Sequence, residues 1–291
     1  MKIQRNLIYI LVFCIALSIM IISIVHDSIW FFEIKSWITN EVYRTNLNNL
    51  AVQDGVHIQN LIDAFRYIMK REGIFYFDYD IVFGTAIFQL LIPFIAAVPA
   101  YRIGESRKSI DHYRICRSGS YSGFLWKQIL TEAGRAALSI FAAYLAYYLI
   151  CLAFENTQGD WIIHELFLDI LGNDFYHSHL HLYYLLEGTI RFFLIPFVYA
   201  VFAETAALFF NDRKQVILFP SVWFYGITAI AFVLMRICGT CSLFLYLCPT
   251  TIMANGDYEN LNSFAMIGVH LVPLLISWFL IRYETRHREI V

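Results

Sequence analysis

Six long apolar runs constrain this chain more than any other feature of its sequence. Each holds 18 to 21 residues, and at a rise of 1.5 Å per residue such a helix spans roughly 27–32 Å, enough to cross a bilayer core. Lipid offers the backbone no hydrogen-bond partners, so each run predicts a helix. The sequence therefore predicts an all-α, polytopic membrane protein with spans at 6–25, 81–101, 136–154, 192–210, 216–235 and 264–281.

The composition agrees with this prediction and excludes other classes. Charged residues make up 15% of the chain and hydrophobic residues 59%, whereas a soluble protein carries about 25% charged residues. A net charge of −2 and the lack of any zinc-finger or helix-turn-helix spacing argue against nucleic acid as a partner. Six cysteines in 291 residues do not indicate a disulfide scaffold.

A cleaved signal peptide is the alternative interpretation of the first run, because the basic stretch MKIQR precedes it. Its apolar stretch of about 20 residues is longer than the usual ~7–15, and no convincing A-x-A site follows it. We expect an uncleaved span.

Lysine and arginine set the expected orientation. With the N-terminus inside, the inner segments are 1–5, 102–135, 211–215 and 282–291, and the outer loops are 26–80, 155–191 and 236–263. The shorter inner segments hold 14 of the 21 basic residues. The positive-inside rule therefore predicts N-in and C-in, with residues 1–291 as a single transmembrane domain.

The outer loops contain two stretches with helical spacing of apolar residues. In NLIDAFRYIMKRE these are Leu61, Ile62, Phe65, Ile68 and Met69, and a second stretch runs from Trp161 to Leu171. They either lie flat on the membrane with the apolar side down or pack on each other as a small lid.

The inner segment RIGESRKSI, Arg102–Ile110, has the lysine and serine that end a phosphate-binding loop. That loop requires G-x-x-x-x-G-K-[ST], so that backbone N–H groups can wrap the phosphates. Arg102 and Arg107 stand at the two glycine positions, and the preceding element is a predicted membrane helix. We therefore expect no nucleotide site and no catalytic residue in this chain.

The same segment carries a resemblance to a known family. Six spans with both ends inside, and a charged loop between spans two and three, resemble the membrane subunit of an ABC-2 type transporter. The loop matches the family's order of a charged cluster, small residues and then a helix with an aromatic residue and a lysine. The matching residues are Glu105, Arg107, Arg117, Ser118, Gly119, Tyr121, Phe124 and Lys127.

The resemblance implies partners and a mechanism. Two permease subunits pair in a bacterial cell membrane, as a homo- or heterodimer, and each docks an ABC ATPase subunit that binds ATP and Mg²⁺; the permease itself is no enzyme and holds no cofactor. Contact with the ATPase would fall on the coupling loop 102–135, where charges set docking register. The candidate contact residues are Glu105, Arg107, Lys108, Arg114, Arg117 and Lys127. Alternatively, the basic residues only fix topology and bind anionic lipid head groups.

Two departures from the family concern the substrate. Only five residues precede the first span, so the usual amphipathic entry helix is absent or very short, and the loop 26–80 is long. These features resemble bacterial exporters of peptides, antibiotics or lipid-like molecules more than polysaccharide exporters.

Glu204 is the only carboxylate within the predicted spans, and His270 the only imidazole. Glu204 lies seven residues before Asn211, about 10 Å below the inner surface. An intramembrane carboxylate suggests a translocation path, a cationic substrate or a partner across a dimer, or else a structural hydrogen bond. His270 is the second candidate residue for the translocation path, although a buried, hydrogen-bonded core histidine is the commoner alternative.

Two clusters remain in the outer loops. In an extended HSHLH segment, His177, His179 and His181 would share one side, but zinc also needs a fixed second shell, so we expect an aromatic-rich interfacial loop without metal. Cys238, Cys241 and Cys248 are expected to supply one structural disulfide.

Two other functions remain open on the sequence alone. The Cys238-x-x-Cys241 pair is compatible with a membrane thiol oxidoreductase, although such an enzyme needs a second cysteine pair. The long outer loops are compatible with a structural or peptide-sensing membrane protein.

Overall fold

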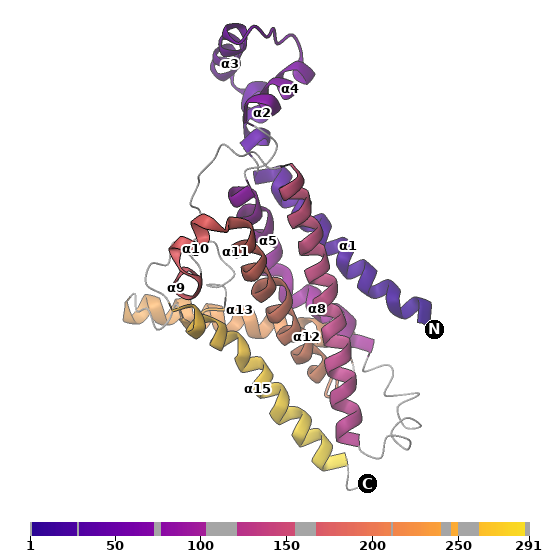
Figure 1. Cartoon of the computed structure of the whole chain (residues 1–291). Helices are drawn as coiled ribbons and strands as arrows, with labels where there is room; N and C mark the ends of the chain where they lie inside the picture. The colour runs from indigo at the N-terminus through magenta and orange to yellow at the C-terminus, as the bar shows by residue number, and fades with distance from the viewer. Residues whose placement is uncertain are drawn as a thin grey trace. The chain divides into compact units, whose positions relative to one another are not determined.

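The structure, a computed structural model, describes residues 2–27, 29–72, 77–102, 121–154, 167–210, 212–239, 246–249 and 262–288. Every regular element among these residues is a helix, which confirms the all-α prediction (Figure 1). The chain divides into two compact units. Unit 1 comprises Met1–Leu17, Gln89–Tyr144 and His164–Val291, and unit 2 comprises Ser18–Phe88 and Leu145–Ile163.

Six helical segments are long and apolar enough to cross a membrane, which confirms the predicted spans as a set. They are α1 (Lys2–Asp27), α5 (Phe77–Ala97) with the 3-10 turn η1 (Val98–Ala100), α8 (Tyr121–Ala153), α11 (Leu180–Thr189) continued by η2 (Ile190–Leu194) and α12 (Ile195–Ala206), α13 (Arg213–Cys238) and α15 (Ser263–Arg288). The third and fourth begin well before their predicted apolar runs, and the sixth ends well after its run. An apolar run ends at the first charge, whereas a helix continues as long as its backbone bonds can form.

The largest extension is at α8. The predicted span begins at residue 136, but the helix begins at Tyr121 and runs for 33 residues without interruption. The fourth span also begins earlier, at Leu180 instead of residue 192. Charged residues assigned to loops 102–135 and 155–191 therefore lie within membrane-spanning helices.

A π-helical turn explains how the fourth span accommodates proline. Pro196 lacks an N–H group, and its ring would clash with the carbonyl four residues earlier in a regular helix. The wider turn η2, Ile190–Leu194, immediately precedes it and places Pro196 in the first turn of α12. Pro93, Pro220 and Pro273 lie inside α5, α13 and α15.

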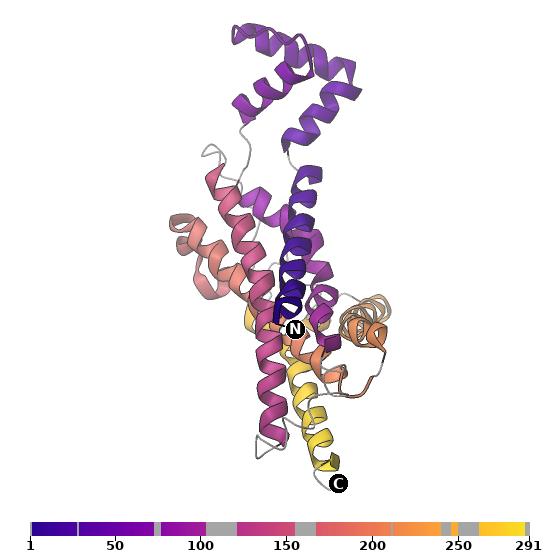
Figure 2. The ribbon, with the colours of Figure 1, turned by 90° about the vertical axis from the view of Figure 1, so that its right-hand side faces the viewer.

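Helix α12 forms the centre of unit 1. It packs against α15, α13, η1 and η2, and Val198 to Ala206 are all buried. Helix α13 crosses α12 steeply: it is seen along its length in Figure 1 and nearly end-on in Figure 2. Only one stripe of α13 is buried, namely Val216, Pro220, Ser221, Phe224, Thr228 and Ala231, and the opposite face is exposed and apolar.

Unit 2 contains a small helical cluster formed by α2 (Ile29–Thr39), α3 (Glu41–Gln53) and α4 (Leu61–Glu72). Its core consists of Leu47, Ala51, Tyr67 and Ile68. Arg44 closes the end of α2 by donating to the carbonyls of Trp37 (2.9 Å) and Ile38 (2.8 Å). The cluster buries the side of α4 that carries Tyr67 and Ile68.

The helix predicted from NLIDAFRYIMKRE is therefore confirmed as α4, in which Leu61, Ile62 and Phe65 remain exposed. Of the second predicted stretch, residues 161–166 lie outside the described residues, so the predicted lid stays a prediction. Its last four residues form the short helix α9 (Leu168–Leu171).

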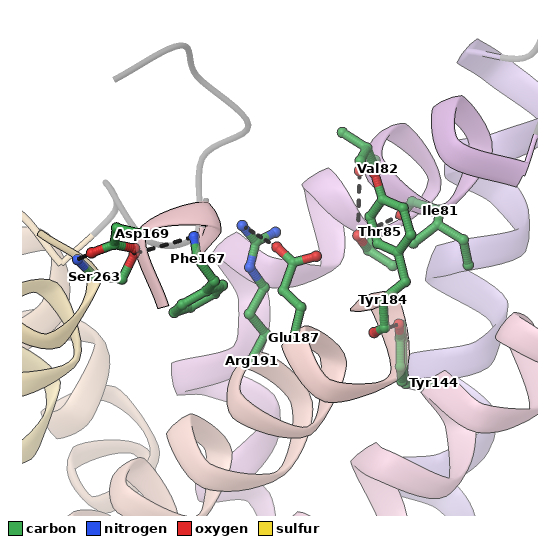
Figure 3. A network of polar contacts seen from close by, with 10 residues as sticks. All are labelled: Ile81, Val82, Thr85, Tyr144, Phe167, Asp169, Tyr184, Glu187, Arg191 and Ser263. Atoms are coloured by element: carbon green, nitrogen blue, oxygen red, sulfur yellow. Dashed lines mark hydrogen bonds and ion pairs between the residues drawn. The ribbon is translucent and has the colours of Figure 1, made fainter. Parts of the chain in front are cut away.

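Asp169 on α9 holds the start of α15. Its carboxylate accepts hydrogen bonds from the Ser263 main-chain N–H (2.8 Å) and hydroxyl (2.6 Å). The Ser263 hydroxyl oxygen in turn accepts from the N–H of Phe167 at 3.1 Å. Figure 3 shows these three residues together. The contact fixes residues 167–171 on the first turn of the last span.

Candidate functional site

Glu204 lies near the end of α12 and is 1% exposed. The helix positions it because every residue around it in α12, from Val198 to Ala206, is buried as well. Its Oε2 atom has no hydrogen-bond partner in the described part of the chain. A carboxyl group is thus held inside an apolar helical unit, and no basic residue within the described ranges forms an ion pair with it.

Tyr9 and Glu132 form the neighbouring part of this site. Tyr9 on α1 donates a hydrogen bond from its hydroxyl to Oε2 of Glu132 on α8. Arg135 lies one turn further along α8 and donates from Nη1 to Oε1 of Glu132 at 3.1 Å. The Glu132 side chain is 11% exposed and that of Arg135 is 44% exposed, so this ion pair lies at the edge of the buried region.

Glu204 belongs to the same constellation. It lies within electrostatic range of Glu132 and Tyr9, but its Oε2 makes no hydrogen bond to either residue. Hydrogen bonds join Tyr9 of α1 with Glu132 and Arg135 of α8, and Glu204 of α12 lies near them without such a bond from its Oε2. We call Tyr9, Glu132, Arg135 and Glu204 the carboxyl site.

Of these two carboxyl groups, only that of Glu204 was predicted from the sequence. Glu132 precedes the apolar run that begins at residue 136, so the sequence places it in the inner loop. Glu204 is the only carboxylate of the predicted spans, but the helix α8 begins earlier than its predicted span and includes Glu132. A signal was present in the buried stripe Leu125, Ile129, Ala133 and Ala136, which continues the helical period backwards past Glu132.

His270 lies in a different place. It is 2% exposed on α15, and its Nδ1 lies 3.3 Å from the hydroxyl of Tyr199 on α12. The Tyr199 ring also meets Phe224 of α13 edge-to-face. This environment fits the buried, hydrogen-bonded core histidine weighed above, and the structure does not place His270 beside Glu204.

A second buried charged pair was missed by the sequence reading. Glu187 on α11 and Arg191 on η2 form an ion pair of 2.8 Å between Oε1 and Nη2, with side chains 4% and 3% exposed. Figure 3 shows the two side chains pointing toward each other. Its signal is the i, i+4 spacing of opposite charges at the edge of an apolar run.

The extended segment predicted for the histidines is wrong. His177 lies in α10 (Asn173–Ser178), His179 caps its end, and His181 lies in α11. A helix with a break turns the three rings in different directions, whereas a strand would have aligned them. The part of the chain that the structure describes holds no group of three or more side chains placed to bind one metal ion.

The cysteines and the coupling residues are placed only in part. Cys238 is exposed at the end of α13 and Cys248 is buried, and the two are not bonded to each other. Cys241 lies outside the described residues, so a disulfide to it stays a prediction. Glu105, Arg107, Lys108, Arg114 and Arg117 also lie outside them.

Lys127 is the one candidate coupling residue within the described ranges. It lies in the second turn of α8 and is exposed. Its carbonyl accepts a hydrogen bond from the Thr131 hydroxyl at 2.6 Å, which is an ordinary bond within a helix. Lys127, five residues before Glu132 on the same helix, is therefore on the exposed side of α8.

Two features of the described residues bear on function: a buried carboxyl site in the membrane-spanning helices, and an exposed basic start of α8. Comparison of the chain with protein-family models, with curated proteins and with solved structures finds no match.

Proposed function

We propose that this chain is the permease subunit of an ABC-2 type transporter, a multi-pass protein of a bacterial cell membrane. It works with a second permease subunit, identical or similar, and with separate ATPase subunits that bind ATP and Mg²⁺. The cargo is a peptide, an antibiotic or a lipid-like molecule. The chain itself carries out no covalent chemistry.

The observation that carries this proposal is the length of α8. Its 33 residues extend for roughly 50 Å, whereas the hydrocarbon core of a membrane is about 30 Å thick. About 20 Å of the same helix therefore projects beyond the core. This projecting part begins at Tyr121, directly after the segment 102–120 that resembles a coupling loop.

A continuous helix transmits movement from one end to the other. Lys127 lies on the projecting part, and Glu132 and Tyr144 lie further along the same helix, each buried against another helix. An ATPase that displaces the segment 102–120 would therefore shift Glu132 relative to α12. The proposed result is that the path between two paired permeases opens and closes.

The exposed apolar side of α13 supports pairing in the membrane. It carries Leu218, Val222, Ile230, Phe232, Val233 and Ile237, each at least 49% exposed. These side chains suit either lipid or a second permease, and the proposal requires that one permease dimer forms somewhere on this apolar surface.

The test is recruitment of an ATPase. The full chain is affinity-purified from its native membrane, bound proteins are identified by mass spectrometry, and ATP hydrolysis is measured in lipid nanodiscs. We expect an ATP-binding-cassette protein to co-purify, and the double variant Arg107→Glu with Lys108→Glu to lose at least nine tenths of it.

A matched control reverses two positive charges elsewhere. Lys35 and Arg66 are exposed on α2 and α4, in the predicted outer loop, so Lys35→Glu with Arg66→Glu should retain the ATPase. Failure to recover any ATPase, or equal loss in both double variants, would contradict the proposed function.

A further inference from the structure

The exposed side of α4 carries apolar and basic side chains next to each other. Leu61, Ile62 and Phe65 are 46%, 63% and 39% exposed, and Arg66 and Lys70 are exposed as well. We propose that these five residues, called the α4 patch, bind the surface of the membrane that the spans cross. The apolar side chains enter the outer edge of the acyl chains, and the two basic groups contact anionic lipid phosphates. The contact does not depend on whether an ATPase drives the protein, so it goes beyond the proposed function.

The helix arranges the α4 patch in a definite order around its axis. At about 100° per residue, Leu61, Phe65 and Ile62 cover an arc of about 100°, and Arg66 and Lys70 follow within about the next 80°. An apolar stripe with basic residues along one edge is typical of a helix that lies in a membrane surface. The long side chains of arginine and lysine can cover apolar surface while their charged ends reach the head groups.

The other side of α4 is used for folding. Ala64, Tyr67 and Ile68 are 0%, 5% and 0% exposed, and Tyr67 and Ile68 belong to the core of the α2–α4 cluster. The sequence pattern grouped Ile68 with Leu61 and Phe65, whereas the structure assigns Ile68 to the core. Because the core uses the buried side alone, the cluster can bind the membrane through the α4 patch without opening.

The exposed side of α4 is complementary in charge to an anionic lipid surface. Neither Arg66 nor Lys70 uses its side chain in a hydrogen bond or ion pair with another described residue. Asp63, the acidic residue of the first turn, accepts a hydrogen bond from the main-chain N–H of Gln59 at 3.3 Å, so its carboxylate lies at the start of the helix. The two cations beside the apolar stripe therefore favour anionic head groups.

The chain itself keeps α4 close to a membrane. Only residues 73–76 separate the end of α4 at Glu72 from Phe77, where α5 begins a segment able to cross a membrane. Five residue steps reach at most about 18 Å. At the other end of the cluster, α2 begins at Ile29, two residues after α1 ends at Asp27. A bilayer surface is thus within reach of the α4 patch, whereas a soluble partner would have to arrive by diffusion.

The neighbouring helix α3 lacks this pattern. Around its axis the exposed Val42 and Val52 are separated by the exposed Thr45 and Asn49, so they form no continuous apolar stripe. Its arginine, Arg44, donates to main-chain carbonyls at the end of α2. Helix α3 therefore provides an internal reference for an experiment on α4.

Quenching by lipid tests the proposal on the full chain. A fluorescent amino acid is introduced by stop-codon suppression at position 62 and, in a second protein, at position 49. Each protein is placed in nanodiscs of phosphatidylcholine with about one third phosphatidylglycerol, with or without bromine on the acyl chains near the head group. We expect bromine to quench at least half of the fluorescence at position 62 and less than a tenth at position 49.

Reversal of charge tests the basic edge of the α4 patch. Arg66→Glu with Lys70→Glu should lower the quenching at position 62 at least threefold, and nanodiscs without phosphatidylglycerol should do the same. The matched control, Lys35→Glu with Arg236→Glu, reverses two exposed basic residues on α2 and α13 and should leave the quenching unchanged. Arg66→Lys with Lys70→Arg keeps both charges and should also retain it.

Three outcomes would overturn the proposal: equal quenching at positions 62 and 49, equal loss in the two double reversals, or quenching at position 62 that does not depend on phosphatidylglycerol. Weak quenching at position 62 in every lipid would mean that the α4 patch faces water or a soluble partner, and the proposal would fail. Should the reversal of Arg66 and Lys70 prevent folding, as judged by circular dichroism, Arg66→Gln with Lys70→Gln takes its place. The comparison of lipids needs no substitution in the α4 patch beyond the label.

Discussion

Tyr144 on α8 donates a hydrogen bond of 2.7 Å from its hydroxyl to the main-chain carbonyl of Tyr184 on α11. Its ring stacks on Phe192 with the centroids 4.4 Å apart and occupies the space that Gly188 leaves open. Figure 3 shows Tyr144 beside the backbone of Tyr184. Unit 2 repeats this arrangement, since Tyr147 donates to the carbonyl of Asp80 at 2.6 Å over Gly84.

A methyl group at position 188 should disrupt this contact. A Cβ atom there would lie 2.1 Å from Cε1 of Tyr144, so Gly188→Ala must displace the ring and its hydrogen bond. We expect a loss of about 1–3 kcal/mol in unfolding free energy, measured as a lower melting temperature by circular dichroism in detergent. Gly134→Ala is the matched control on α8, since a Cβ atom there meets nothing within 4 Å, and it should not lower the melting temperature.

Removing the carboxylate of Asp169 should loosen the start of α15. Asp169→Ala leaves the Ser263 N–H and hydroxyl without their acceptor, which costs about 1–3 kcal/mol for bonds to a charged group. Hydrogen–deuterium exchange followed by mass spectrometry should show faster exchange at residues 263–266. The control is Asp174→Ala, an exposed acidic residue in the first turn of α10. Equal exchange in both variants would exclude the proposed role of Asp169.

The buried pair Glu187–Arg191 should behave as one unit. Glu187→Gln leaves the Arg191 guanidinium buried without its counter-charge, with an expected loss of about 3–5 kcal/mol. The double variant Glu187→Gln with Arg191→Met removes both charges and should be more stable than Glu187→Gln alone. Unfolding in a graded series of denaturing detergent measures both, and strictly additive effects would show that the two residues are not coupled.

The hydrogen bond between Tyr67 and Asp54 should make the α2–α4 cluster sensitive to alkali. The Tyr67 hydroxyl donates to Oδ2 of Asp54 at 2.6 Å, and burial, together with this bond to a carboxylate, raises the pKa of Tyr67 above its usual 10.0. Because the folded state then holds the proton more tightly than the unfolded state, the stabilisation is complete below about pH 10 and is lost as the pH rises further.

Tyr67→Phe isolates this effect. It should cost about 1 kcal/mol at pH 7 and should remove the part of the alkaline loss that Tyr67 causes. The difference in melting temperature between wild type and variant should therefore shrink above pH 10. A constant difference from pH 7 to pH 11 would show that Tyr67 does not titrate with unfolding.

A break in α8 should uncouple its two ends under the proposed function. Lys127→Pro removes one helical hydrogen bond and kinks the helix between the segment 102–120 and Glu132. We expect the ATPase to bind but an ATP-dependent change in maleimide labelling of the exposed Cys238 to be lost. Lys127→Ala keeps the helix and should retain that change, so identical behaviour of the two variants would refute a rigid α8.

The carboxyl site shows why only some of its residues could be predicted from the sequence. Glu204 was recognised because a carboxylate in an apolar run stands out. Glu132 was not recognised, because it lies among polar residues before the apolar run that begins at residue 136. Tyr9 was not recognised either, because it is an ordinary tyrosine within the first apolar run. Only the folded structure distinguishes them, through the hydrogen bond from Tyr9 on α1 to Glu132 on α8.

The sequence by itself determined that the chain is all-helical, with six segments able to cross a membrane, because runs of apolar residues this long have only helices available to them in lipid. It also determined α4, through the spacing of its apolar residues. The tertiary structure decided which polar residues those helices enclose. Burial of Glu132, Glu187 and Arg191 depends on contacts between residues tens to hundreds of positions apart. Helical periodicity and hydropathy report only local preferences, so they could not predict it.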